Sequence, residues 1–77
     1  MRIHVECYAG HQGEQTPQRL IFDGRAVKVT DVVDRWLAPD HRYFKVKGED
    51  RATYILRHDA VSGLWYLVMF DSGRAVS

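Results

Sequence analysis

Hydrophobic and polar residues alternate along much of the chain, a pattern typical of β-strands with one buried face. Near the N-terminus, Ile3, Val5 and Cys7 alternate with polar residues and predict a short strand. A longer block with the same period runs over residues 19–70. Residues 9–18 lie between the two and are polar, with two glycines and a proline, so they predict a long loop.

The first tight turn of the long block is predicted at Asp23-Gly24, which lies between two alternating apolar runs. A two-residue hairpin turn of type I′ needs positive φ at both central residues, and aspartate and glycine adopt that conformation readily. With these residues at the turn, Leu20 faces Val27 across the ladder and both side chains point to the buried face.

Residues 30–38 fit two structures. Their apolar spacing is compatible with a helix capped by Thr30, but the β-branched residues and the short length favour a strand. We therefore expect the strand after the hairpin turn to continue, with a bulge near Thr30-Asp31 that moves the buried side chains from odd to even positions.

Three further strands are predicted over residues 43–47, 51–58 and 64–70, joined by turns at 48–50 and 59–62. The apolar residues of neighbouring strands meet if the turns are short. The expected cross-strand pairs are Phe44–Tyr54, Val46–Ala52, Lys47–Arg51, Leu56–Trp65, Tyr54–Leu67 and Ala52–Met69.

These strands predict an all-β, antiparallel meander in a single domain that spans residues 1–77. A sheet this small must curl on itself to bury one face, so we expect five to six strands in a small SH3-like barrel or a strongly bent sheet. Residues 71–77 are polar and predict a frayed tail. The predicted core comprises Ile3, Val5, Leu20, Phe22, Val27, Val29, Trp36, Phe44, Val46, Tyr54, Leu56, Trp65, Leu67 and Met69.

Composition limits the function classes. The chain carries 11 Lys and Arg against 10 Asp and Glu, so no strong overall field attracts nucleic acid or a membrane. A single cysteine cannot form an internal disulfide, which argues against a secreted, disulfide-stapled domain. The longest uncharged apolar run, residues 64–70, is much shorter than the roughly 20 residues of a membrane helix. The charged start also lacks the apolar core of a signal peptide, so we expect a cytoplasmic protein without membrane contact.

Residues suited to catalysis or metal binding are sparse. His4, Cys7 and His11 have a ligand-like spacing, but His4 and Cys7 would point to opposite faces of a strand. The serines lie in turns or in the tail, outside any nucleophile motif. We therefore expect no enzyme activity, no metal site and no cofactor.

The face of the predicted sheet that points away from the core carries the candidate site. Arg19 would oppose Lys28, and Lys47 would oppose Arg51; like charges across a ladder suggest an anionic partner. The strand over residues 64–70 is apolar on both faces, so the N-terminal strand or loop, a second copy of the chain or an external ligand should cover it. The candidate binding residues are Tyr43, Lys45, Lys47, Arg51, Ile55, Arg57 and Tyr66.

Several segments resemble a family of short, uncharacterised bacterial β proteins. They are Phe22-Asp-Gly-Arg25, Val29-Thr-Asp-Val-Val-Asp-Arg-Trp36, Tyr43-Phe44-Lys-Val46, Tyr54-Ile-Leu56-Arg-His-Asp59 and Trp65-Tyr-Leu67. The most distinctive element is Asp34-Arg35-Trp36, and the resemblance leaves out residues 1–18. It implies no assigned activity. It also implies that some relatives are encoded near DNA-repair polymerase genes, which adds only slight support to nucleic acid as a partner.

The Asp34-Arg35-Trp36 element has two interpretations. In one, Arg35 is a recognition residue beside an aromatic platform. In the other, Trp36 anchors the core and Arg35 lies across the sheet; the need of a small domain for large core side chains favours this second interpretation.

The sequence as a whole predicts a non-catalytic binding or assembly module that acts through the candidate binding residues. Its partner would be another protein or a second copy of the chain. The alternative is weak binding of single-stranded nucleic acid, in which Lys45, Lys47, Arg51 and Arg57 contact phosphates while tyrosine rings stack on bases.

Overall fold

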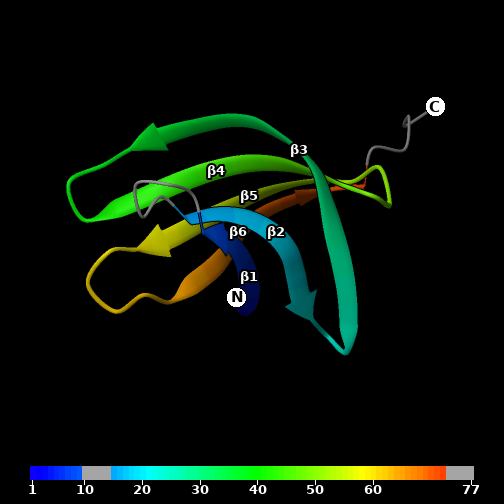
Figure 1. Ribbon diagram of the computed structural model, residues 1–77, viewed down its shortest axis with the longest axis horizontal. Coiled ribbons are helices and arrows are strands. Elements are labelled where there is room, and N and C mark those ends of the chain that lie inside the picture. The colour runs from blue at the N-terminus through cyan, green and yellow to red at the C-terminus, as the bar shows by residue number, and fades with distance from the viewer. Residues whose placement is uncertain (10–14, 73–77) are drawn as a thin grey trace.

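Short turns connect successive strands from residue 15 onward, so strands that follow one another in sequence are neighbours in the sheet (Figure 1). The computed structural model describes residues 1–9 and 15–72, and within them the chain is all-β. Six antiparallel strands form a closed barrel, which confirms the predicted fold class. They are β1 (Arg2–Ala9), β2 (Gln15–Phe22), β3 (Arg25–Leu37), β4 (His41–Gly48), β5 (Thr53–Asp59) and β6 (Trp65–Asp71).

The first half of the chain holds more strand than we predicted. β2 begins at Gln15, so residues 15–18, which we expected in a polar loop, belong to a strand. Pro17 is tolerated there because it lies next to a shift in the β1–β2 register, where the ladder is already irregular. The rest of the predicted loop at residues 10–14, and residues 73–77 of the predicted tail, lie outside the described residues.

The β2–β3 hairpin has the predicted turn and the predicted register. Asp23 and Gly24 have φ values of 51° and 69°, as a type I′ turn requires. Leu20 pairs with Val27, and both side chains are buried in the core.

β3 is a single strand of 13 residues, which confirms the strand interpretation of this segment. The predicted bulge is present, since the register with β4 shifts between Val29 and Asp31. A second shift lies between Val32 and Asp34 and was not predicted. Each bulge adds one residue to β3, so the second bulge returns the inward face from even to odd positions.

Two residues predicted to lie in the core are therefore on the outside. Trp36 follows the second bulge of β3, pairs with Tyr43 on the outer face and is 41% exposed. Met69 follows a shift in the β5–β6 register, pairs with Ile55 on the outer face and is 59% exposed. In both cases a single inserted residue reverses which side chains point inward.

The β4–β5 hairpin turns one residue later than predicted, with its loop at residues 49–51. The carboxylate of Asp50 explains the shift, because it accepts hydrogen bonds from the Ala52 N–H at 3.0 Å and the Tyr54 hydroxyl at 2.5 Å. In the β4–β5 ladder each cross-strand partner moves by two positions, so the inward face of this hairpin is preserved although the predicted pairs are wrong. The predicted β5–β6 pairs are wrong as well. The pairs in the structure are Phe44–Leu56, Val46–Tyr54, Lys47–Thr53, Leu56–Leu67, Arg57–Tyr66 and His58–Trp65.

One hydrophobic cluster fills the barrel. β1 closes the barrel against the start of β6, where Arg2 pairs with Tyr66 and Ile3 with Trp65. The end of β6 stays uncovered by β1, and residues 68–70 are about half exposed. No helix among the described residues is long and apolar enough to cross a membrane. The buried core residues are Ile3, Val5, Leu20, Val27, Phe44, Val46, Ala52, Tyr54, Leu56 and Trp65.

Candidate binding site

A transverse row of side chains crosses the outer face of the barrel over five strands. Trp36 on β3 pairs with Tyr43 on β4, which pairs with Arg57 on β5. Arg57 pairs with Tyr66 on β6, which in turn pairs with Arg2 on β1. Because directly opposite residues of an antiparallel ladder share a face, all five side chains lie on the same side of the sheet. We call these five residues the aromatic row.

The members of the aromatic row contact one another in two pairs. Trp36 and Tyr43 stack with their ring centroids 5.6 Å apart and their planes 10° apart. The Arg57 guanidinium carbon lies 4.7 Å from the centroid of the Tyr66 ring, which is a cation–π contact. One face of each of the three aromatic rings is thus already in contact within the molecule. These contacts hold the rings in place before any partner binds.

Arg57 occupies the middle of the row and is the most unusual group in it. Its side chain is half-buried, and its Nε is buried without a hydrogen-bond partner. A buried donor without an acceptor costs about 1–3 kcal/mol. The positive charge of Arg57 slightly lowers the pKa of the Asp59 carboxyl. The main cause of that lowered pKa is the pair of hydrogen bonds from the Ser62 and Val61 N–H groups. Arg57 is therefore a partly desolvated cation that no carboxylate in the described part of the chain neutralises by an ion pair.

Two lysines of the candidate site lie beside the row on the same face, but each faces a carboxylate. Lys45 stands between Asp34 on β3 and Ile55 on β5. Lys47 stands directly opposite Asp31 on β3. The β3–β4 pairing that brings these charges together was not part of the sequence prediction, and it makes this part of the face mixed rather than basic.

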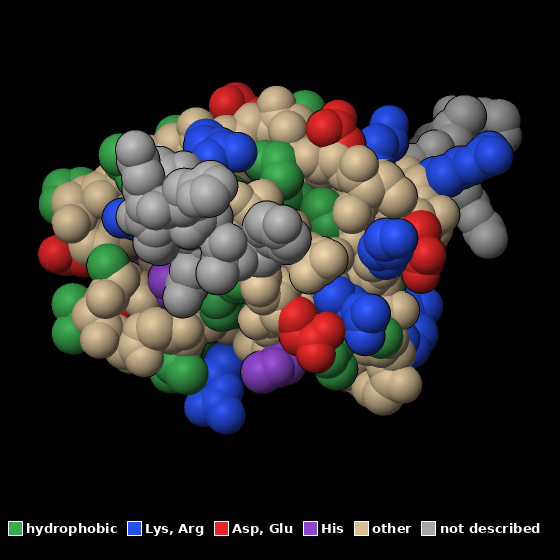
Figure 2. Space-filling view, in the orientation of Figure 1, with side chains coloured by type: hydrophobic (Ala, Val, Ile, Leu, Met, Phe, Trp, Pro, Cys, Tyr) green, Lys and Arg blue, Asp and Glu red, His purple; other side chains and the backbone are tan. Residues whose placement is uncertain are grey.

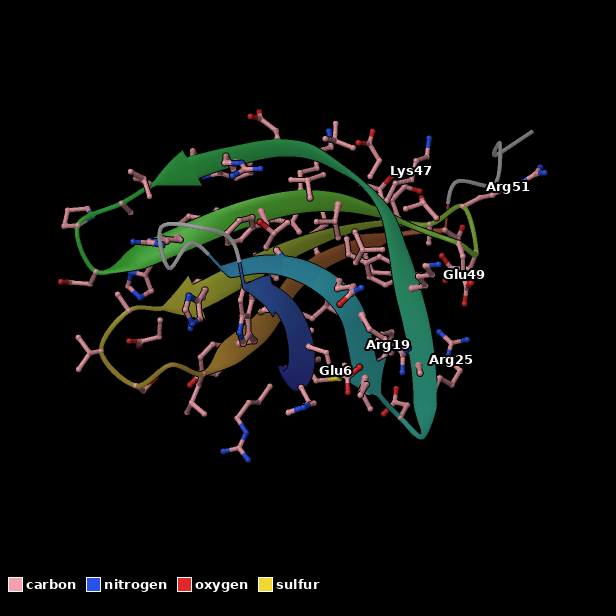
Figure 3. All side chains as sticks on the ribbon, in the orientation of Figure 1. Glu6, Arg19, Arg25, Lys47, Glu49 and Arg51 are labelled. Atoms are coloured by element: carbon pink, nitrogen blue, oxygen red, sulfur yellow. The ribbon has the colours of Figure 1, made fainter. Side chains whose placement is uncertain are left out.

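Arg51 does not join the other candidate residues on the strand face. It lies in the β4–β5 turn with φ of 68°, so the predicted pair of Lys47 with Arg51 is wrong. Both residues lie at the end of that hairpin together with Glu49 (Figure 3). Basic and acidic side chains alternate on the visible face at this end of the molecule (Figure 2).

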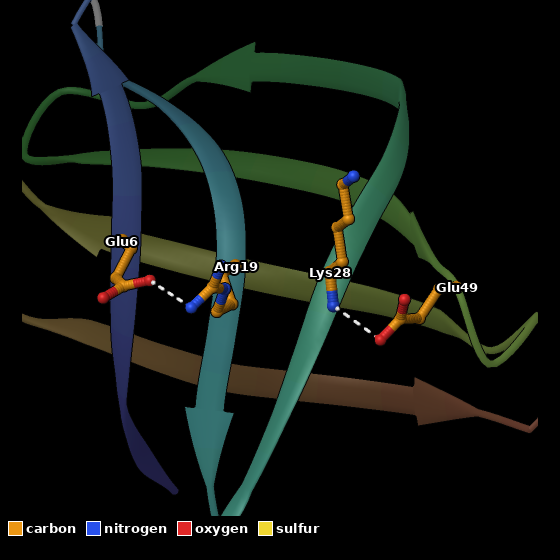
Figure 4. Close-up of polar contacts among 4 residues, drawn as sticks. All are labelled: Glu6, Arg19, Lys28 and Glu49. Carbon is orange, nitrogen blue, oxygen red and sulfur yellow. Dashed lines mark hydrogen bonds and ion pairs between the residues drawn. The ribbon is translucent and has the colours of Figure 1, made fainter.

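The second predicted like-charge pair, Arg19 opposite Lys28, is present, and a carboxylate of the chain pairs with one of the two cations. Arg19 also faces Glu6 on β1 and forms an ion pair with it at 3.4 Å (Figure 4). Glu49 docks on the backbone of Lys28, donating its N–H to the carbonyl at 2.8 Å and accepting from the N–H at 3.5 Å. The Glu6 carboxylate therefore compensates the charge of Arg19, whereas Glu49 contacts only the backbone of Lys28.

Chemistry-bearing groups elsewhere are dispersed. Within residues 1–9 and 15–72, no three His, Cys, Asp or Glu side chains are grouped closely enough to hold a metal ion. The Cys7 thiol is half-buried, and burial raises its pKa, which lowers the fraction of reactive thiolate. His11 lies outside the described residues.

Sequence reasoning missed Trp36 as a surface residue, although a signal was present. Asp31 and Asp34 are three residues apart, so a regular strand would point one of them into the barrel. Burying an unpaired carboxylate is costly, and an extra residue between the two avoids that cost. The inserted residue is Val33, and it places the following Trp36 outside.

Comparisons of the chain with models of protein families, with curated proteins and with solved structures gave no match. The interpretation of the aromatic row therefore depends on its own geometry and charge.

Proposed function

We propose that the protein is a non-catalytic binding module that holds an acidic segment of a partner protein against the aromatic row. The observation that carries this proposal is Arg57, a half-buried guanidinium that lies on the ring of Tyr66 and has no ion pair with the described residues. A carboxylate from a partner would give it a charge-assisted hydrogen bond, the strongest kind of polar contact at an interface.

The composition of the row also supports a protein partner. Tryptophan, tyrosine and arginine are the residue types that most often carry binding energy at protein interfaces. The row offers both kinds of contact that an acidic segment needs. Three aromatic rings supply apolar surface, and Arg57 and Arg2 supply positive charge. No member of the row is acidic, in contrast to the lysines beside it, each of which faces an aspartate.

Single-stranded nucleic acid is the second candidate, and the exposed position of Trp36 favours it. Base stacking needs an open ring face, and Trp36, which is 41% exposed, has the most exposed ring of the row. Two features weaken this candidate. Tyr43 already uses one ring face on Trp36, and Asp31 and Asp34 would repel phosphates from the neighbouring lysines.

The proposal also includes the cellular setting expected from the sequence. The module would act in the cytoplasm and belong with the short bacterial β proteins that share the Asp-Arg-Trp element. A second copy of the chain is an alternative partner, because Met69 near the end of β6 is 59% exposed and pairs with Ile55 on the outer face beside the row.

The test is a titration of the isotope-labelled protein, followed by NMR, with two probes of opposite type. One is the acidic peptide acetyl-Glu-Phe-Glu-Phe-Glu-amide, and the other is an eight-residue oligothymidylate. We expect the peptide to shift the Trp36 indole, the Arg57 Nε–H and the Tyr43 and Tyr66 amides in a saturable way. Arg57→Gln should weaken peptide binding at least tenfold, about the value of one charge-assisted hydrogen bond.

Arg42→Gln is the matched control, because it removes a cation from exposed β4 without touching the row. Tighter binding of the oligonucleotide, with a steep loss of affinity in salt, would favour the second candidate. Absence of row shifts with both probes at millimolar concentration would refute the proposed site.

A further inference from the structure

β2 and β3 separate beyond their shared hairpin and leave a cleft in the barrel wall. Their ladder ends at Arg19–Lys28. Beyond this pair, residues 15–17 of β2 pair with β1 and residues 29–37 of β3 pair with β4. In Figure 1, β3 swings across the molecule away from β2. The two facing edges therefore lack a strand partner on this side among the described residues.

The cleft has a volume of about 380 Å³ and mixed chemistry. Val29 and Val32 are half-buried and pack on the hydrophobic core, so they supply an apolar floor. The other lining residues of β3, Thr30 and Asp31, are polar, and the rest of the lining belongs to the edge of β2. Among the described residues, the lining is Thr16, Pro17, Gln18, Val29, Thr30, Asp31 and Val32.

We propose that this cleft binds an extended, basic segment of a partner protein, which adds to the edge of β3 as an extra strand. An open strand edge presents N–H and C=O groups that an incoming strand can pair with, and this mode of recognition is common. The opposite edge is a poor template, because Pro17 has no N–H to donate. The segment would therefore run along β3 rather than along β2.

Charge and side-chain alternation define the segment. Side chains of an added strand alternate between two faces, as they do in β3 itself. On one face they would meet the apolar floor at Val29 and Val32, which calls for aliphatic side chains. On the other they would meet Asp31 and Asp34, which are exposed, lie opposite Lys47 and Lys45 on β4, and form no ion pair within 4 Å in the described part of the chain. Lysine or arginine at alternate positions would supply the complementary charge.

A second copy of the chain fits this edge poorly. Antiparallel pairing of two β3 edges would bring the Asp31 and Asp34 side chains of both copies to the same short ladder, and like charges across a ladder are destabilising. The two bulges of β3 also interrupt the alternation that regular self-pairing needs. A basic segment of another protein would not place aspartates opposite Asp31 and Asp34. Its sequence can also be matched to the bulges of β3, which a second β3 edge cannot.

The experiment uses the probe peptide acetyl-Lys-Val-Lys-Val-Lys-Val-amide and its matched counterpart with glutamate in place of lysine. NMR titration of the full chain should show saturable amide shifts at Thr16, at Gln18 and over residues 29–34 with the lysine peptide. The glutamate peptide should bind there at least tenfold more weakly. Asp31→Asn should weaken lysine-peptide binding about threefold to fivefold, the value of one exposed ion pair.

A variant that fills the cleft provides an independent readout. Thr16→Trp places a large ring at the rim and should reduce binding of the lysine peptide at least tenfold, while Asp40→Asn in the β3–β4 turn should leave it unchanged. Thermal unfolding of each variant checks that the fold is retained. Equal binding of both peptides, or shifts confined to the aromatic row, would overturn the proposal. A doubled molecular mass without peptide, with β3 edge amides protected from exchange, would overturn it in favour of a second copy.

The two proposed sites fail separately. Loss of the cleft shifts with the aromatic-row shifts intact would leave the proposed function standing, since the acidic and basic probes report on different faces and on different variants.

Discussion

The Tyr54 hydroxyl donates a hydrogen bond to the Asp50 carboxylate at 2.5 Å, which links the buried core to the β4–β5 turn. Tyr54 is fully buried, and the other oxygen of the same carboxylate accepts from the Ala52 N–H. A single side chain thus fixes the turn, the register of the hairpin and the polar end of a core tyrosine. This contact decides where the β4–β5 strands meet and hence which residues oppose one another on the outer face.

Removing either partner of this hydrogen bond should destabilise the fold. Tyr54→Phe should cost about 1.5–3 kcal/mol, the range for a hydrogen bond to a charged group, and it leaves the Asp50 carboxylate short of a donor. Tyr43→Phe is the matched control, because Tyr43 lies on the outer face, and we expect it to change stability by less than about 0.5 kcal/mol. Urea unfolding measures both values. Equal effects of the two variants would contradict the role of the Asp50 contact.

The same contact should make the fold sensitive to alkali. Burial, the hydrogen bond to Asp50 and the Asp50 charge raise the pKa of Tyr54 from 10.0 to about 12. A group with a raised folded-state pKa contributes stability that is complete below its unfolded pKa and is lost as pH rises through the folded value. Stability should therefore fall between pH 10 and pH 12. Urea unfolding across this range should show a shallower fall for Tyr54→Phe than for the parent.

Gly48 should tolerate no side chain. A Cβ at this position would lie 2.6 Å from Asp50 Oδ1 and 2.7 Å from Val27 Cγ1, both closer than contact distance. Gly48→Ala should therefore cost about 1–3 kcal/mol through overpacking and displacement of the Asp50 carboxylate. Gly24→Asn is the control, because space there is open and asparagine adopts positive φ. Thermal unfolding should separate the two variants clearly.

Alternation was enough to predict five to six antiparallel strands in a barrel or a strongly bent sheet, but it did not show which of the two forms, or which face of the sheet every side chain lies on. The Asp23-Gly24 turn fixes one register, because two positive φ values leave little choice. The β4–β5 register depends instead on a contact between Asp50 and Tyr54 that no local pattern indicates. In the candidate site, Tyr43, Arg57 and Tyr66 were predicted on one face and lie on one face, whereas Arg51 depended on the mistaken register.

The two tryptophans should respond differently to truncation. Trp65 is buried and packs against Phe44 with ring centroids 5.4 Å apart, so Trp65→Ala should cost about 3–5 kcal/mol. Trp36 is exposed on the outer face, so Trp36→Ala should cost less than about 1.5 kcal/mol, mostly the lost stacking on Tyr43. Urea unfolding distinguishes the two. Similar costs for both would mean that Trp36 is a core residue after all.

His58 should make stability depend on pH near neutrality. Its ring stacks on Trp65 with centroids 4.2 Å apart, and burial, with the charge of Arg42, lowers its pKa from 6.5. A Gly63 backbone contact and Asp59 oppose this shift without reversing it. Protonation is therefore less favourable in the folded than in the unfolded chain.

The resulting stability is present above pH 6.5 and is lost as pH falls through the lower folded-state pKa of His58. Asp59 also has a lowered pKa, but its contribution is complete above pH 3.8 and is lost only in more acidic solution, so the two effects fall in different windows. Urea midpoints between pH 7.5 and pH 5 should decrease for the parent and for His41→Gln. They should stay nearly constant for His58→Gln, because glutamine cannot gain the proton that burial and the charge of Arg42 disfavour in the folded chain. An unchanged slope in that variant would assign the pH dependence to another group.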